Sequence, residues 1–245
     1  MPWIGDLVPM QSTTPLSQGA WLTQAVGQQI VRGSNCNLPI EPFTEKDLQN
    51  AFNVSRTIIR EAVKSLHAKG LIESRQNVGI IVRPRSEWNL LDPDVLDWSL
   101  SSLPNQGVVE HIIEVRRLIE PGVAEIAARR RSPQALIRIE EAAARMRKSV
   151  QRLADFNDAD MAFHSAIFAA TQNDYCICLG RAISGALFRA FQISAVNSDR
   201  ALQAALKHER VADAIRQRDA GRARDAMLLI IDQAGADLSA SLSPK

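Results

Sequence analysis

Three residues in the C-terminal half of the chain could bind a metal ion together. Asp160 and His164 are four positions apart, so both side chains lie on one face if this segment is a helix. His208 lies in the apolar stripe of a later helical segment, which directs it toward the interior of a bundle. One carboxylate and two imidazoles suit a divalent ion such as Zn²⁺. Each residue could equally be a structural hydrogen-bonding partner, so the sequence leaves both interpretations open.

A second group of residues is suited to DNA. Arg56, Arg60 and Lys64 are spaced by four and share one face of a predicted helix, opposite the apolar residues Ile59 and Leu66. An arginine guanidinium matches the O6/N7 edge of guanine in the major groove. A solvated basic face is the alternative. The residues that we expect to contact bases or phosphates are Lys46, Ser55, Arg56, Thr57, Arg60, Lys64, Arg75, Gln76 and Asn77.

The elements around these basic residues follow a helix-turn-helix order. Apolar spacing predicts a first helix over 20–31 that stops at Gly33, a short second helix after Thr44 and a third after Ser55. Beyond Gly70, two β-type runs flank an Asn/Gly turn and predict a hairpin. Three helices followed by a hairpin form a winged helix-turn-helix, which favours DNA binding over a solvated face.

The remainder of the chain is predicted to be helical. No β-rich run follows Asp92, and Ala-rich amphipathic stretches with short breaks predict six or seven helices. Pro121 should kink the helix predicted over 107–131. The fold class is therefore mainly α, with an N-terminal winged helix-turn-helix and a C-terminal all-helical bundle. We expect a flexible leader, the winged domain, a linker and the helical domain over residues 1–18, 19–85, 86–91 and 92–245.

Composition and charge agree with this division. With 46% hydrophobic and 23% charged residues the chain should fold, and its charge of +2 is unevenly distributed. Residues 1–85 carry nine basic and six acidic side chains, whereas residues 86–245 carry 20 and 21. No apolar stretch approaches the ~20 residues of a membrane span, and the N-terminus lacks a signal-peptide pattern. We therefore expect a cytoplasmic protein that does not enter membranes.

The predicted winged domain resembles that of a known family. The similarity is carried by four runs over 43–48, 54–62, 66–72 and 79–82, which resemble the N-terminal domain of GntR-type bacterial regulators. By position, the resemblance implies that Lys46, Arg56 and Arg60 contact DNA. Two departures are visible: the loop before Phe43 lacks the usual Pro-Gly pair, and Asn77 replaces a common wing glycine.

The helical part resembles the effector domain of the FadR branch of that family. The resemblance covers roughly residues 92–240 and includes the runs Val115–Pro121, Asp160-x-x-Phe163-His164 and His208–Ala223. It implies a divalent ion bound by one Asp and three His, a small carboxylate effector and a homodimer on a palindromic operator. Asp160, His164 and His208 match the first three metal ligands.

The fourth ligand position falls at Ile230, which cannot bind a metal. Either the effector and water complete the coordination, or the site contains no metal. Arg116 matches a position that faces the ligand cavity, where its guanidinium could bind a carboxylate or form an i, i+4 bridge with Glu120. The residues expected at the effector are Arg116, Asp160, His164 and His208.

These observations predict a ligand-responsive repressor that a small carboxylate releases from double-stranded DNA. The linker Trp88–Trp98 resembles that of relatives that respond to sugar acids such as galactonate. The competing hypothesis is a helical metal-dependent hydrolase or lyase that uses Asp160, His164 and His208. Against an enzyme, the sequence has no HExxH, nucleophile elbow or phosphate loop. A helical adaptor without ligand or operator is a third possibility.

Overall fold

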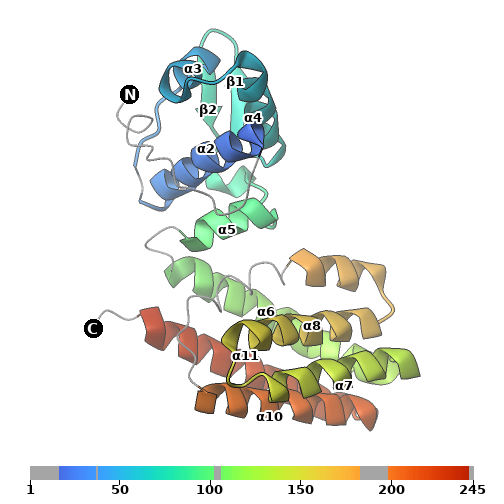
Figure 1. The fold of residues 1–245 in the computed structure, drawn as a ribbon. Helices are drawn as coiled ribbons and strands as arrows, with labels where there is room; N and C mark the ends of the chain where they lie inside the picture. Colours follow the sequence, from blue (N-terminus) through green and yellow to red (C-terminus); the bar gives the residue numbers. More distant parts are fainter. Residues whose placement is uncertain (1–16, 37, 102–105, 183–197, 243–245) are drawn as a thin grey trace. The chain divides into compact units, whose positions relative to one another are not determined.

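The computed structural model describes residues 17–36, 38–101, 106–182 and 198–242. The expected leader over 1–18 therefore lies almost entirely outside the described residues. The chain divides into two compact units, Met1–Asn105 and Gln106–Lys245 (Figure 1). Each unit is described separately below.

The first unit has the element order of a winged helix-turn-helix, with one further helix at its end. Helix α2 packs against α4 and α5, and α3 packs against α4. The elements are α2 (Gln18–Asn35), α3 (Glu45–Phe52), α4 (Arg56–Ala68), β1 (Ile72–Arg75), β2 (Gly79–Val82), η1 (Arg85–Glu87) and α5 (Pro93–Ser101).

Side-chain caps fix where three of these helices begin. Thr44 and Asp47 form a capping box at α3, and the Ser55 hydroxyl accepts a hydrogen bond from the Ile58 N–H at α4. The Asp92 carboxylate accepts hydrogen bonds from the first N–H groups of α5, where Pro93 occupies the first turn. The predicted starts of the second and third helices are confirmed.

The predicted end of the first helix is wrong. Helix α2 passes through Gly33 and ends at Asn35. A Cβ at Gly33 would lie 3.0 Å from Cδ1 of Ile40, so this glycine provides space for the returning chain and does not stop the helix.

The predicted hairpin is confirmed. Strands β1 and β2 are antiparallel, with Ile72 opposite Val82 and Arg75 opposite Gly79. The turn between them holds Asn77 at φ 62°, in the left-handed region where asparagine is among the best tolerated side chains. Asparagine therefore suits the position that is commonly glycine in the family that the sequence resembles.

Helix α5 belongs to the core of the first unit. Val95 and Trp98 join the buried cluster that contains Leu22, Val26 and Ile30 of α2. The Trp98 ring lies against Gly27, and a side chain at position 27 would overlap it. The segment after the wing is thus packed against the winged domain, although we expected the second domain to begin at residue 92.

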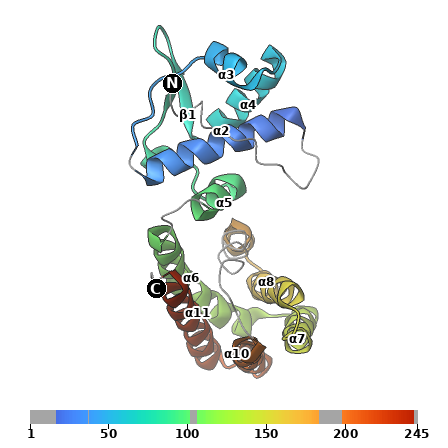
Figure 2. The same ribbon diagram turned by 60° about the vertical axis from the view of Figure 1, so that its left-hand side comes forward.

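The second unit is a helix bundle. Helix α6 packs against α11, α8 and α10, and α7 packs against α8 and α10 (Figure 2). Among the residues that the structure describes, its helices are α6 (Gln106–Arg130), α7 (Pro133–Lys148), α8 (Leu153–Ala170), α10 (Ser198–Arg216) and α11 (Ala220–Leu242), and residues 174–182 are also helical. The fold class predicted from the sequence is confirmed.

Two prolines of this unit occupy different places in their helices. Pro121 lies inside α6, which continues to Arg130. Pro133 is in the first turn of α7, after Ser132, whose hydroxyl caps the helix. Among the helices described, none is both long and apolar enough to cross a membrane.

Candidate functional sites

The residues predicted to bind DNA are all solvent-exposed in the first unit. Arg56, Thr57, Arg60 and Lys64 lie on the outer side of α4, whose inner side buries Ile59, Ala62 and Leu66. The Arg60 Nε atom lies 3.6 Å from Oε2 of Glu45 at the start of α3. This exposed ion pair is weak, so the arginine can exchange it for DNA.

The remaining predicted DNA contacts flank this helix. Lys46 is exposed on α3, and Ser55 precedes α4 as its cap. Arg75, Gln76 and Asn77 form the exposed tip of the hairpin, where the Arg75 Nε donates to Glu73 at 2.7 Å. The basic side chains thus gather on α3, α4 and the wing, as a DNA-binding surface requires.

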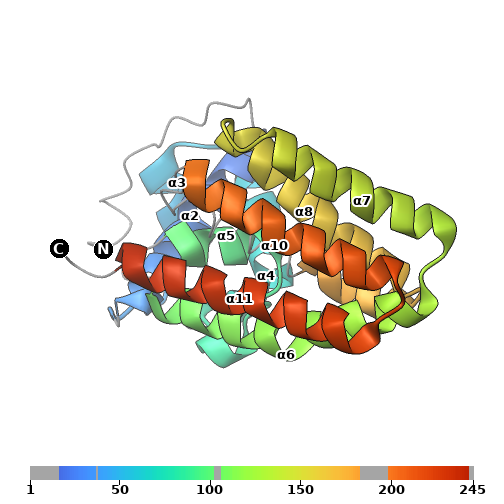
Figure 3. The same cartoon turned by 90° about the horizontal axis from the view of Figure 1, so that it is seen from below.

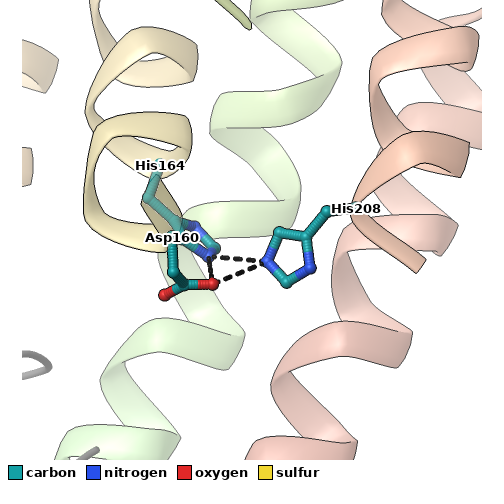
Figure 4. A group of neighbouring side chains, drawn as sticks. All are labelled: Asp160, His164 and His208. Carbon is teal, nitrogen blue, oxygen red and sulfur yellow. Dashed lines mark hydrogen bonds and ion pairs between the residues drawn. The ribbon is translucent and has the colours of Figure 1, made fainter. Parts of the chain in front are cut away.

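In the second unit, three buried side chains meet at one point. Asp160 and His164 come from α8, and His208 comes from α10 (Figure 4). His208 Nε2 lies 3.0 Å from Oδ1 of Asp160 and 3.3 Å from Nε2 of His164, and that His164 atom lies 3.8 Å from the same oxygen. The structure therefore brings together the three residues that the sequence predicted as metal ligands.

Both imidazoles are oriented by contacts on their opposite nitrogen. The His208 Nδ1 lies 2.8 Å from the Ala204 carbonyl oxygen, which can only accept, so this nitrogen carries the hydrogen. The His164 Nδ1 lies 2.8 Å from Oε2 of Glu120, in a buried ion-pair contact. A partner on the outer nitrogen is typical of metal-binding histidines, because it directs the other nitrogen toward the ion.

Glu120 is the residue of this site that sequence reasoning missed. It accepts from the Nε of Arg116 at 2.6 Å on one oxygen and contacts His164 with the other. Arg116 and Glu120 are both buried, so the i, i+4 bridge left open by the sequence is formed. The sequence could have predicted that Arg116 and Glu120 are buried. Both charged residues fall on the apolar stripe of α6 that includes Ile113 and Ala124.

The contacts within this buried cluster favour ionised carboxylates next to cationic side chains. Burial opposes ionisation of Glu120, but the Arg116 guanidinium and His164 outweigh it and lower the Glu120 pKa to about 2. Burial likewise opposes ionisation of Asp160, yet His164 and His208 lower its pKa. Burial acts to lower the pKa of His164, and the Glu120 and Asp160 carboxylates outweigh it and raise that pKa. A positive charge is therefore favoured between the two carboxylates.

The spacing of the three donors suits a divalent ion. Ligands about 2.1 Å from a tetrahedral ion lie about 3.4 Å from one another. The observed separations of 3.0, 3.3 and 3.8 Å bracket that value. Ile230, at the fourth position, is buried on α11 and offers no donor atom.

Comparison with known proteins identifies both parts of the chain. Residues 24–82 match the family described as bacterial regulatory proteins, gntR family, and residues 111–233 match the FCD domain. The chain belongs to the GntR family. This regulator is 36% identical over 208 residues to the galactonate operon transcriptional repressor of Escherichia coli K12, covering 84% of this chain and 90% of that protein.

Two other known proteins are similar to this GntR regulator. It is 32% identical to the HTH-type transcriptional regulator LutR of Bacillus subtilis 168, covering 74% of this chain and 83% of LutR. The solved structure of E. coli McbR/YncC superposes with a TM-score of 0.54 at 14% identity, covering 94% and 100% of the two chains, and supports the fold alone.

The chain is therefore a DNA-binding transcriptional regulator and not an enzyme, as predicted. The hypothesis of a metal-dependent hydrolase or lyase receives no support from these relatives, which are transcriptional regulators.

Proposed function

We propose that this regulator is a repressor that a small carboxylate, such as a sugar acid, releases from its operator. The relative with 36% identity is named for the galactonate operon, which supports a sugar acid as the effector class. The similarity of the Trp88–Trp98 linker to relatives that respond to sugar acids supports the same class.

The convergence of Asp160, His164 and His208 is the observation that carries the effector site. These residues would bind a divalent ion such as Zn²⁺, which would supply a positive centre for the carboxylate of the effector. Because Ile230 gives no fourth donor, one coordination position would be open to the ligand. Arg116 would contribute to this site through its ion pair with Glu120, which keeps His164 in place.

The exposed basic surface of one chain would contact one half-site of the operator. In this proposal, the exposed face of α4 enters the major groove and the wing tip contacts the backbone or the minor groove. A homodimer would present two such surfaces to a palindromic sequence.

Release follows from linkage between the two sites. An effector that binds the free regulator more tightly than the DNA-bound form lowers the affinity for DNA by the same factor. The proposal therefore requires that operator DNA weakens effector binding as much as effector weakens DNA binding.

The DNA-binding part is tested with Arg60→Ala. Operator fragments are first selected from genomic DNA by the wild-type protein, and their affinity is then measured for each variant. Losing a guanine contact should weaken binding by about 10-fold to 100-fold and relax the preference at one position. Arg32→Ala, at an exposed arginine outside the predicted set, is the matched control. Unchanged affinity and sequence preference in Arg60→Ala would contradict the assignment.

The effector site is tested by calorimetric titration with Zn²⁺ and with galactonate. We expect binding in the wild type and its loss in His164→Ala and His208→Ala. His67→Ala, at an exposed histidine of the first unit, should bind like the wild type. Zinc binding that survives both substitutions would show that the ion binds elsewhere, and galactonate binding without zinc would assign the site to a metal-free ligand.

A further inference from the structure

Helix α6 has a second apolar side that faces solvent. Leu118 is 82% exposed and Val115 is 42% exposed, and Ile119, Gly122 and Ile126 continue the same stripe at intermediate exposure. Their spacing of three and four residues places all five on one face over about three turns.

This stripe is separate from the face that builds the candidate effector site. Arg116 and Glu120 point into the bundle with Val123 and Ala124, whereas the stripe lies on the outer side of the helix. Figure 3 shows α6 along an edge of the helical unit with α11 beside it. Single exposed apolar side chains are ordinary on a protein surface, but an aligned row of them on one helix marks a contact surface.

We infer that this stripe, Val115–Leu118–Ile119–Gly122–Ile126, is the surface on which two copies of the chain pair. The inference rests on the proposed homodimer and identifies which face forms it. A helix pairs closely with another where a small residue lies at the crossing point, and a Cβ added at Gly122 would meet no atom within 4 Å.

The charges beside the stripe select an antiparallel arrangement. Its N-terminal half is flanked by exposed Glu114, and its C-terminal end carries exposed Arg129 and Arg130. A two-fold axis that makes the two α6 helices antiparallel brings Glu114 of one copy toward the arginines of the other. A parallel pair would place like charges opposite each other, which is unfavourable. This complementarity favours a second copy of the same chain as the occupant.

The first experiment measures the mass of the full-length protein over a range of concentrations by sedimentation. The wild type should be a dimer, and Leu118→Glu should weaken dimerisation by about 100-fold or more, because the two-fold axis introduces the charge twice. The control is Ile137→Glu at an exposed position of α7, which should remain dimeric. Circular dichroism should be the same for all three proteins, since both positions are exposed.

The outcomes separate this inference from the proposed function. A dimer that persists in Leu118→Glu would overturn the α6 interface and leave the homodimer in place. A wild type that is monomeric at every concentration would overturn both. Equal dissociation of Leu118→Glu and Ile137→Glu would show that the effect is not specific to the stripe, and would also overturn the interface.

A second experiment tests the antiparallel register. Cys36, Cys176 and Cys178 are first replaced by serine, and Leu118→Cys and Ile126→Cys are made separately in that background. Mixed copies should cross-link under mild oxidation because the two positions face each other across the two-fold axis. Leu118→Cys by itself should not cross-link. If it does so as efficiently as the mixture, the helices are not antiparallel.

Discussion

Glu120 connects a buried arginine to a candidate metal ligand. One of its oxygens binds the Arg116 Nε, and the other contacts the Nδ1 of His164. A buried ion pair of this kind is not a strong source of stability, because desolvation offsets most of the attraction. Its value to the protein is the position that it gives to the imidazole, whose other nitrogen then faces Asp160.

A double-mutant cycle on Arg116 and Glu120 should reveal strong coupling. Arg116→Met leaves the Glu120 carboxylate buried without its main cation and should lower the free energy of unfolding by about 3–5 kcal/mol. Adding Glu120→Gln removes the uncompensated charge, so the double variant should be more stable than Arg116→Met. Urea unfolding at neutral pH with a chelator present measures each value. A double variant whose loss equals the sum of the two single losses would contradict the coupling.

At the scale of the elements, Lys69 connects α4 to α5, the helix that follows the wing. It ends α4, and its Nζ lies 2.9 Å from Oδ1 of Asp92 and 2.7 Å from Oδ2 of Asp94 at the start of α5. The ammonium also lies 5.9 Å from the centre of the Trp98 ring. One cation thus interacts with the amino-terminal end of α5 and with a residue of the core.

Removing this cation should loosen α5. Lys69→Met leaves two carboxylates without their partner and should lower the stability of the first unit by about 1–3 kcal/mol. Lys64→Met, at an exposed lysine of the same helix, is the control and should change stability little. Chemical denaturation at pH 7 compares the two. Equal losses in both variants would mean that the contact with α5 contributes nothing.

The stability that Lys69 contributes should decrease at high pH. Burial acts to lower the Lys69 pKa, but the hydrogen bonds to Asp94 and Asp92 outweigh it and raise that pKa. A raised lysine pKa adds stability that is fully present below the unfolded value of about 10.4 and is lost as the pH rises through the folded value. The difference between wild type and Lys69→Met should therefore be constant from pH 7 to about 10 and shrink as the pH rises above about 10.4.

The wing turn should tolerate only certain residues at position 77. Asn77 has a φ of 62°, a conformation that costs a β-branched residue about 1–2 kcal/mol. We expect Asn77→Val to lower stability by that amount and Asn77→Gly to leave it nearly unchanged. Thermal unfolding of the three proteins without DNA distinguishes them. Equal stability of the valine and glycine variants would exclude backbone strain at this turn.

Local signals predicted most of the elements, and contacts between distant segments account for the errors. The caps Thr44 and Ser55 act within their own turn, so the sequence revealed where α3 and α4 begin. Gly33 gave a false helix end because its role depends on Ile40 after the helix. For the site, an i, i+4 pattern predicted Asp160 and His164, whereas the contact of Glu120 with His164 spans two helices and has no local signature.

At the scale of the whole molecule, two separately packed units must communicate if the proposal is correct. The first carries the exposed basic side chains of α3, α4 and the wing, and the second contains the Asp160–His164–His208 cluster. Coupling between them would appear as reciprocal changes of affinity, which can be measured without knowing the path that carries them.

Changing the spacing between the two half-sites of the operator tests whether two DNA-binding units act together. Inserting five base pairs between the half-sites rotates one of them by about half a turn of the DNA. A homodimer with two linked α4 helices should then lose most of its affinity and bind no better than to a single half-site. Inserting ten base pairs restores the helical face and controls for sequence changes. Unchanged affinity after the five-pair insertion would indicate that each chain binds alone.

The packing of α5 also decides where sensing domains can be exchanged between relatives. Because Trp98 occupies the space left by Gly27, a junction at the end of the wing would separate α2 from the indole that covers it. A chimera made with a cut after Ser101 would keep that surface intact. For the design of biosensors that pair this operator specificity with a new effector, α5 should therefore be transferred together with the DNA-binding module.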